Sequence, residues 1–326
     1  MLLLKKLIKK SIGVEYLNRR IDEVVVNKAT NFKVQQIERD LHILRDAVSM
    51  LSEMKDDALS KRVEEVLAGI SVINTSRENS FEDKKFIFVC GLHRSGTSLF
   101  TKILQEHPDI SGFENTGVIE DEGQFLQTLY KPDRDLGWPG SFGFSKEAHL
   151  TEESNLISEK NRNKIFQQWS NYWDMNKTCL IEKSPPDLLK TRFLQALFPN
   201  SFFIIIRRHP VATCMATRKW SNSSMYSLIK HWVKCYDIWD EDKQYINNFI
   251  EIKYEDFILE PNKLLESVSE LCELGKSDAI HDAVGRYNLS CAVNEKYFKE
   301  WDTMKWQKLL TNMVCKRNFE RHGYEL

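Results

Sequence analysis

The stretch FIFVCGLHRSGTSLFTKIL, residues 86–104, decides the fold of this 326-residue chain. Its first five residues form an apolar, β-leaning run that ends at Gly91, and apolar residues recur at helical spacing from Leu99 to Leu104. The stretch therefore predicts a strand, a glycine-flanked loop and a helix. Gly91 and Gly96 stand in a G-x-x-x-x-G arrangement, which lets backbone N–H groups converge on an anion at a helix N-terminus. A phosphate-binding loop is predicted, although a plain strand-to-helix turn can give the same pattern.

The residues after the second glycine argue against a triphosphate loop. Loops that bind ATP or GTP carry a lysine there, which reaches the β- and γ-phosphates, and then a hydroxyl that holds magnesium. Here Thr97 and Ser98 follow Gly96, and the cation lies inside the loop at Arg94. An arginine at that place can pair with an anion, but the arrangement differs from the one that a triphosphate and its metal require.

The composition is that of an ordinary globular protein with reduced thiols. Hydrophobic residues make up 42% and charged residues 29% of the chain, and a formal net charge of −1 gives no reason to expect a nucleic-acid partner. The seven cysteines are scattered, with no C-x-x-C pair and no histidines at metal-ligand spacing. We therefore expect neither a disulfide framework nor a zinc site, and a cytoplasmic location.

Residues 1–80 are expected to form a helical extension and linker ahead of an α/β domain at residues 84–326. Apolar residues between Ile37 and Leu51 alternate in steps of four and three, as in a coiled coil, which favours a homodimer or a helix that packs on the next domain. The opening MLLLKKLIKK is too short and too rich in lysine to span a bilayer or to serve as a signal peptide. A basic helix peripheral to a membrane and a frayed terminus both stay open.

Two segments after the first helix have unusual composition. Residues 112–126 are dense in carboxylates, which usually indicates a solvated loop, but this run is flanked by apolar residues and follows the anion loop directly. Residues 131–150 carry glycine, proline or an aromatic residue every few positions and are predicted to be a long irregular loop. Long loops in compact domains are often lids or binding loops.

Two later strands are predicted to end in charged residues. A strand at residues 179–181 leads into Glu182 and Lys183, and the apolar run at residues 201–206 is followed by arginines that include Arg208. Charges at the carboxyl ends of strands in an open α/β sheet lie where ligands bind. Lysine can stabilise charge that develops on a transferred group, and guanidinium suits bidentate phosphate binding. For the first segment, a surface ion pair next to the following helix is the alternative.

Taken in order, these motifs resemble those of sulfotransferases that use 3′-phosphoadenosine 5′-phosphosulfate (PAPS). The loop 94–98 resembles the family's 5′-phosphosulfate loop, Glu-Lys-Ser-Pro at 182–185 resembles a recurrent element, and Arg-x-Pro at 208–210 resembles the 3′-phosphate site. The resemblance covers residues 84–326. It implies an α/β fold with a P-loop-type parallel sheet flanked by helices. The sequence itself predicts helices at residues 156–173, 187–198 and 225–239.

The resemblance also implies a reaction, in which a sulfuryl group passes from PAPS to a hydroxyl acceptor, expected to be a carbohydrate or other glycan. Glu122-Gly-Gln-Phe-Leu resembles a Glu-x-His-Phe-Phe-like element whose glutamate removes the acceptor's proton, with Gln124 in place of histidine. Glu122 is therefore the first candidate for the base and Glu120 the second. Arg94 and Lys183 are implied to neutralise charge on the transferred and leaving groups, and no metal is required.

The implied donor site draws on three parts of the chain. Its residues are Arg94, Ser95, Gly96, Thr97, Ser98, Arg208, Thr217, Lys296 and Tyr297. The family usually has a serine eight residues after its arginine, where this chain has Ala216, and Thr217 is the adjacent hydroxyl. Lys296 and Tyr297 belong to a segment that fits a loop closing over the nucleotide or, equally, an amphipathic helix.

Two rival functions stay open at this point. A P-loop kinase or nucleotide hydrolase would depend on ATP and magnesium, which Thr97 in the lysine position disfavours. A non-catalytic protein that only binds nucleotide or a partner would not need the acidic and basic residues that the motifs retain.

Overall fold

The computed structural model describes residues 81–287, 289, 292–304 and 316–325. The helical extension, coiled coil and linker predicted for residues 1–80, with the homodimer that they favour, lie outside the described residues. Within the described part of the chain, no helix is long and apolar enough to cross a membrane. None of the five cysteines in that part forms a disulfide.

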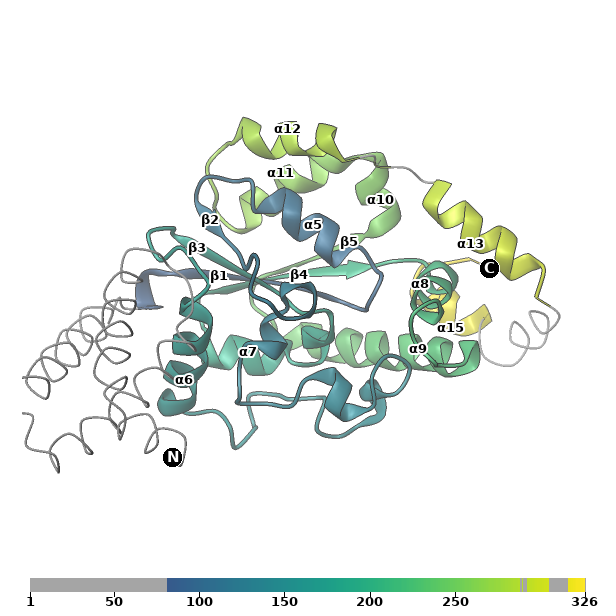
Figure 1. Cartoon of the computed structure of the whole chain (residues 1–326), viewed down its shortest axis with the longest axis horizontal. Helices are drawn as coiled ribbons and strands as arrows, with labels where there is room; N and C mark the ends of the chain where they lie inside the picture. The colour runs from purple at the N-terminus through teal and green to yellow at the C-terminus, as the bar shows by residue number, and fades with distance from the viewer. Residues whose placement is uncertain (1–80, 288, 290–291, 305–315, 326) are drawn as a thin grey trace, which may run out of the picture. The chain divides into compact units, whose positions relative to one another are not determined.

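A parallel sheet of five strands forms the centre of the domain, in the order β2-β3-β1-β4-β5 (Figure 1). The strands are β1 Lys85–Gly91, β2 Ile110–Ser111, β3 Cys179–Lys183, β4 Ser201–Arg207 and β5 Phe249–Lys253. The central strand β1 is the one predicted to lead into the anion loop. Because all five strands are parallel, their carboxyl ends meet at one edge of the sheet, and the motifs that follow β1, β3 and β4 meet there too.

Both faces of the sheet are covered, as the continuous apolar runs in its central strands require. Along β1, Phe86 and Phe88 belong to the core on one face, and Ile87 and Val89 belong to the core on the other. This alternation follows from the two-residue period of a strand. The fold class predicted from the sequence, a parallel α/β sheet flanked by helices, is confirmed.

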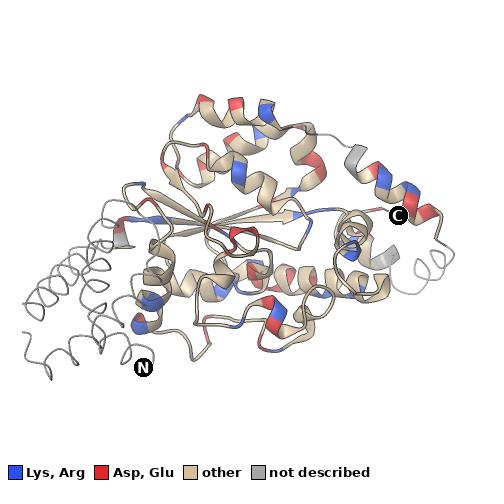
Figure 2. Cartoon of the chain, in the orientation of Figure 1, with Lys and Arg blue, Asp and Glu red and all other residues tan. Residues whose placement is uncertain are grey.

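The helices divide between the two faces (Figure 1). One face is covered by α5 Thr97–Leu104, α10 Tyr254–Leu259, α11 Pro261–Leu271 and α12 Asp278–Arg286. The other is covered by α6 Glu159–Ser170, α7 Thr191–Leu197, α8 Pro210–Arg218 and α9 Met225–Asp242, with α13 Ala292–Asp302 and α15 Lys316–Arg321 further along the chain. Acidic and basic residues mix along the outer helices (Figure 2), in keeping with a net charge near zero.

Two local predictions need correction. The helix predicted at residues 187–198 is interrupted, because a 3-10 turn over Pro185–Leu189 precedes α7, and Lys190 between them has a non-helical backbone, with φ −132° and ψ 14°. The strand predicted at residues 179–181 continues through Glu182 and Lys183, both buried. Charged side chains can stay in a buried strand here because each of them has a polar partner inside the protein.

The segment 131–150 is irregular, as predicted. It contains two 3-10 turns, Asp133–Leu136 and Phe142–Phe144, and otherwise no helix or strand. The segment predicted to be either a closing loop or an amphipathic helix forms the helix α13.

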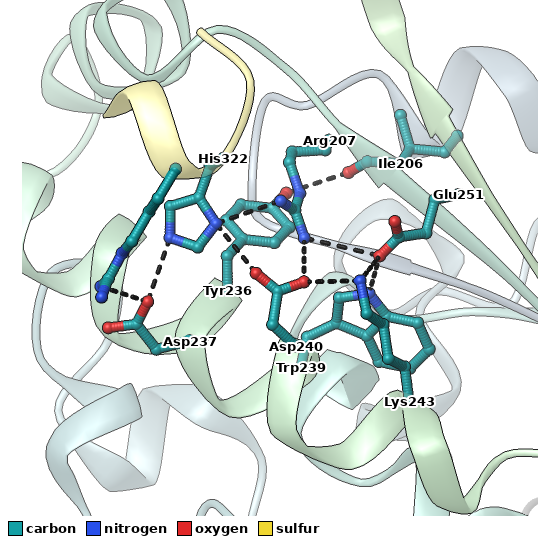
Figure 3. Close-up of polar contacts among 10 residues, drawn as sticks. Ile206, Arg207, Tyr236, Asp237, Trp239, Asp240, Lys243, Glu251 and His322 are labelled. Atoms are coloured by element: carbon teal, nitrogen blue, oxygen red, sulfur yellow. Dashed lines mark hydrogen bonds and ion pairs between the residues drawn. The ribbon is translucent and has the colours of Figure 1, made fainter. Parts of the chain in front are cut away.

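A polar cluster around the buried side chains of Arg207 and His322 joins the C-terminal segment to the sheet (Figure 3). Arg207, the last residue of β4, donates from Nη2 to Asp240 Oδ1 at 3.0 Å. His322 lies between two carboxylates of α9, with Nε2 3.0 Å from Asp237 Oδ1 and Nδ1 3.0 Å from Asp240 Oδ2. Because buried charges need partners, this cluster holds the chain after α15 against α9 and β4.

The contacts of Asp240 in this cluster make the free energy of unfolding depend on pH. Burial raises the pKa of this carboxyl, but the hydrogen bond with His322 and the charge of Arg207 outweigh burial and hold the pKa well below its usual value. A carboxyl with a depressed folded pKa contributes stability above its unfolded pKa and loses that contribution as the pH falls. In urea titrations at pH 7, we expect Asp240→Asn to lower the free energy of unfolding by about 1–3 kcal/mol.

The difference between Asp240→Asn and wild type should shrink below about pH 4, where the unfolded carboxyl becomes protonated. Glu266→Gln, at an exposed position of α11, is the control and should leave the unfolding curve unchanged. Equal stability of Asp240→Asn and wild type at pH 7 would contradict a stabilising role for the cluster.

Candidate functional site

A cavity of about 430 Å³ opens where the strands' carboxyl ends meet. It is lined by segments that follow four different strands, as well as by residues of the carboxylate-rich segment and of the irregular loop. The lining residues used below are His93, Arg94, Gly96, Thr97, Ser98, Glu120, Glu122, Phe125, Trp138, Arg208, Trp220 and Tyr254. The structure thus brings together the anion loop, both candidate bases and the Arg-x-Pro arginine at one site.

The loop after β1 has the geometry of an anion site. The turn begins with a hydrogen bond from Ser95 N to Leu92 O at 3.0 Å, and Gly96 takes the left-handed conformation, φ 104°, immediately before α5. The first N–H groups of a helix lack partners within the helix, so those of Thr97 and Ser98 can bind an anion at the positive end of its dipole. Arg94 also has a positive φ of 68°, and its guanidinium lies 5.5 Å from the ring of Trp220.

Of the carboxylates in the segment 112–126, Glu122 is the one that is buried. Its Oε1 accepts from Lys183 Nζ at 3.1 Å, and its Oε2 accepts from Gln124 Nε2 at 2.6 Å. Glu120 also lines the cavity, but it is exposed, and its backbone oxygen accepts from Lys183 Nζ at 2.8 Å. Glu114 is exposed and does not line the cavity. The first candidate base is therefore the one held by side chains inside the site.

A second buried carboxyl fixes the backbone next to the candidate base. Glu182 Oε1 accepts from Gly123 N at 2.9 Å and from Ser184 Oγ at 2.5 Å. A Cβ on Gly123 would lie 2.5 Å from Glu182 Oε1, so this approach requires glycine. Burial and the neighbouring Asp187 raise the pKa of Glu182 well above its usual value. Lys183 pairs with Glu122 at 3.1 Å, so the two neighbouring buried carboxyl groups have different side-chain partners.

Arg208 is buried at the other side of the anion loop. Its Nη1 donates to the backbone oxygen of Arg94 at 2.9 Å, and its Nε and Nη2 donate to Asn294 Oδ1 at 2.9 and 2.6 Å. The guanidinium lies 4.3 Å from the ring centre of Tyr254. Asn294 in turn donates to Glu255 Oε1 at 2.6 Å. The arginine is thus fixed in place at the cavity wall, and burial lowers its pKa.

Four of the expected donor-site residues do not line the cavity: Ser95, which is fully buried, and Thr217, Lys296 and Tyr297. Thr217 is buried, and its hydroxyl lies 2.8 Å from Thr213 O and 3.2 Å from His93 O. Tyr297 lies on α13 with its ring 5.7 Å from the Arg208 guanidinium, whereas Lys296 is exposed. A role for Tyr297 would therefore act through Arg208, and the roles of Thr217 and Lys296 stay predictions.

Sequence reasoning missed the aromatic wall of the cavity and the histidine within it. The rings of His93, Trp138 and Trp220 contact one another at centroid distances of 5.6 to 6.3 Å. His93 Nε2 lies 3.1 Å from Asp133 Oδ2. His93 lies within the anion loop, so its position in the sequence could have identified it as a candidate site residue. Its partners come from residues 40 to 127 positions later, and no local pattern joins them.

The fold is a parallel α/β sheet flanked by helices, and its cavity brings the glycine-flanked loop after β1 together with a buried glutamate. The model of the Sulfotransferase family matches residues 87–278, more than half of the chain, and the chain belongs to this family. Among the described residues, no group of His, Cys, Asp and Glu side chains is arranged to hold a metal ion.

Individual relatives are distant. Protein-tyrosine sulfotransferase A of Caenorhabditis elegans is 23% identical over 208 residues, which cover 60% of this chain and 51% of the relative. The chain therefore spans about half the length of that curated relative. The sulfotransferase domain of the Synechococcus PCC 7002 olefin synthase aligns with 18% identity and a TM-score of 0.47, over 74% of this chain and 97% of that domain. A sulfotransferase of Mycobacterium tuberculosis H37Rv aligns with 13% identity and a TM-score of 0.45, over 91% and 98% of the two chains.

Proposed function

We propose that this protein transfers a sulfuryl group from PAPS to a hydroxyl acceptor. The observation that carries the proposal is the meeting of Arg94, Glu122 and Arg208 around one cavity, next to the N-terminus of α5. An anion loop without the triphosphate lysine, a second arginine and a buried carboxylate are the parts that transfer from a phosphosulfate to a hydroxyl needs.

Each part has a role in the proposed reaction. The acceptor oxygen attacks sulfur, the bond from sulfur to the phosphate oxygen breaks, and the acceptor's proton passes to the Glu122 carboxylate. The backbone N–H groups of residues 96–98 and the Arg94 guanidinium hold the 5′-phosphate and its developing charge. Arg208 holds the 3′-phosphate, which distinguishes this donor from ATP. Lys183 does not line the cavity, and it supplies positive charge through its bond to Glu122.

The proposed acceptor is a molecule that carries a hydroxyl group, and glycans are the first candidate class. The aromatic wall formed by His93, Trp138 and Trp220 offers apolar ring surface in the cavity that Glu122 also lines, and an acceptor can pack on it. A phenolic hydroxyl is the second candidate, because the Caenorhabditis elegans relative is named a protein-tyrosine sulfotransferase and because the same wall suits a phenol ring.

Two measurements can separate the proposed sulfotransferase from a kinase and from a non-catalytic nucleotide-binding protein. Calorimetric titration with 3′-phosphoadenosine 5′-phosphate (PAP), and with ATP and magnesium, identifies the nucleotide. Transfer of labelled sulfate from PAPS to an amino-sugar disaccharide or to a tyrosine peptide then tests catalysis. We expect PAP to bind and label to be transferred without added metal. Preference for ATP and magnesium would favour a kinase, and PAP binding without transfer to any acceptor would favour a non-catalytic protein.

The proposed donor site makes a prediction at Gly96. A Cβ there would lie 2.4 Å from the Tyr254 ring, and the φ of +104° is unfavourable for any residue with a side chain. We expect Gly96→Ala to weaken PAP binding in calorimetry by about tenfold or more. The added methyl group would strain the loop by about 1–3 kcal/mol, and the loop would distort to relieve that strain. Gly275→Ala, whose Cβ meets nothing within 4 Å, is the control. Full PAP affinity in Gly96→Ala would contradict the placement of the 5′-phosphate.

A further inference from the structure

The side chain of Gln124 connects three parts of the site. It is fully buried, with 0% of the residue exposed. Its Nε2 donates to Glu122 Oε2 at 2.6 Å, and its Oε1 accepts from the backbone N–H of Asp133 at 3.0 Å. Asp133 begins the first turn of the irregular loop 131–150, and its carboxylate lies 3.1 Å from His93 of the anion loop. One buried path therefore links the candidate base to both loops.

We propose that Gln124 is a positioning residue, which holds the Glu122 carboxylate in the orientation for proton removal and ties that orientation to the loop 131–150. The inference rests on the proposed sulfuryl transfer and deepens it. Lys183 and Gln124 each donate to a different oxygen of Glu122. Two donors on two oxygens define the plane of a carboxylate, and a base must be held within a few tenths of an ångström of its productive position.

The direction of the Gln124 amide follows from its two partners. A carboxylate oxygen can only accept, and the backbone N–H of Asp133 can only donate, so Nε2 must face Glu122 and Oε1 must face Asp133. A glutamine supplies this donor and acceptor at every pH, because an amide does not titrate. Histidine, which stands at this place in the resembling motif, changes its charge near pH 6.5.

Gln127 provides a matched control within the same segment. It is also buried, and its amide bonds to the backbone of residues 124, 129 and 130, including Nε2 to Tyr130 O at 2.8 Å. It does not contact Glu122 and does not line the cavity. The same substitution, glutamine to methionine, therefore removes buried hydrogen bonds at both positions, but only the one at Gln124 reaches the base.

The first test compares Gln124→Met and Gln127→Met by labelled sulfate transfer from PAPS, with thermal melting to confirm folding. We expect Gln124→Met to lower kcat by about 100-fold, the cost of a misplaced catalytic group, and to leave the KM for PAPS within about twofold. Gln127→Met should change the melting temperature but keep kcat within about threefold. A folded Gln124→Met protein with wild-type kcat would overturn the inference while leaving the proposed function intact.

A second test uses Gln124→His and the pH dependence of kcat. Neutral imidazole keeps one donor and one acceptor, whereas imidazolium has two donors and no acceptor, and it brings a full charge to Glu122. The ratio of the variant's kcat to that of wild type should therefore fall as the pH drops below about 6.5. A ratio that does not change with pH would contradict the contact, since a purely structural residue would shift stability alone.

A crystal structure of Gln124→Met tests the inference without turnover. We expect the Glu122 carboxylate to be displaced or to adopt more than one conformer, and an unchanged single conformer would overturn the positioning role. If wild type binds PAP but transfers no label to any acceptor, the proposed function fails, and this structure still decides the role of Gln124.

Discussion

Glu122→Gln should lose about 10²- to 10⁴-fold in kcat, which is the usual contribution of a general base, while PAP affinity stays within about twofold. The substitution keeps the size of the side chain and one acceptor oxygen, but it removes the group that accepts the proton. Labelled sulfate transfer gives kcat, and calorimetric titration with PAP gives the affinity of the donor site.

The same substitution leaves Lys183 without its carboxylate partner. Lys183 still donates to the backbone oxygen of Glu120, so the folded state keeps one of its two contacts. Thermal melting must therefore accompany the kinetics, because a buried charge that loses its partner destabilises the protein. We expect a lower melting temperature and a folded protein.

Two glutamates serve as controls for the base. Glu114→Gln, at an exposed position outside the cavity, should behave as wild type. Glu120→Gln tests the second candidate and should keep kcat within about threefold. A loss at Glu120 with normal turnover in Glu122→Gln would reverse the assignment.

Arg208→Ala should weaken PAP by about 10- to 100-fold, because it removes charge-assisted hydrogen bonds to the proposed 3′-phosphate. Affinity for adenosine 5′-monophosphate, which lacks that phosphate, should stay within about twofold. Arg94→Ala should weaken both nucleotides, because Arg94 is proposed to meet the 5′-phosphate that they share. Calorimetric titration of each variant with each nucleotide measures the pattern.

The control for charge alone is Arg286→Ala, an exposed arginine of α12 paired with Glu106. It should leave both affinities unchanged. Equal losses of PAP and adenosine 5′-monophosphate in Arg208→Ala would contradict the assignment of Arg208 to the 3′-phosphate. In that case the two arginines would share one phosphate.

The anion loop was predictable because its signal is local. The apolar run of β1, the two glycines and the start of α5 lie within one continuous stretch, and each has a direct physical meaning. The placement of Lys183 and Arg208 followed from a general rule, since charges at the carboxyl ends of parallel strands meet at one edge. These parts of the fold needed no knowledge of distant contacts.

The network around the base was not predictable in the same way. Gln124 was visible as a departure from a motif, but its bond to Asp133 depends on how the irregular loop folds back. The contact of His93 with Asp133 has the same origin. The bond from Lys183 to Glu122 joins residues 61 positions apart, and the role of Lys183 toward the transferred group stays a prediction.

The helix predicted at residues 187–198 begins later than predicted, at Thr191, because of contacts that include a residue distant in sequence. Asp187 bonds to Tyr130 at 3.1 Å and pairs with Lys190 at 3.3 Å, and these buried contacts hold the segment in a 3-10 turn before α7 begins. Apolar periodicity cannot report such pairs, since the partners of Asp187 include a residue 57 positions away.

The most direct test of the central claim is the transfer of labelled sulfate from PAPS by the wild-type protein, with EDTA present. We expect PAP and the sulfated acceptor to appear in equal amounts, on an amino-sugar disaccharide or on a phenol, and Glu122→Gln to lower the rate at which both appear by about 10²- to 10⁴-fold. Failure of PAP to bind, together with hydrolysis of ATP in magnesium, would contradict it.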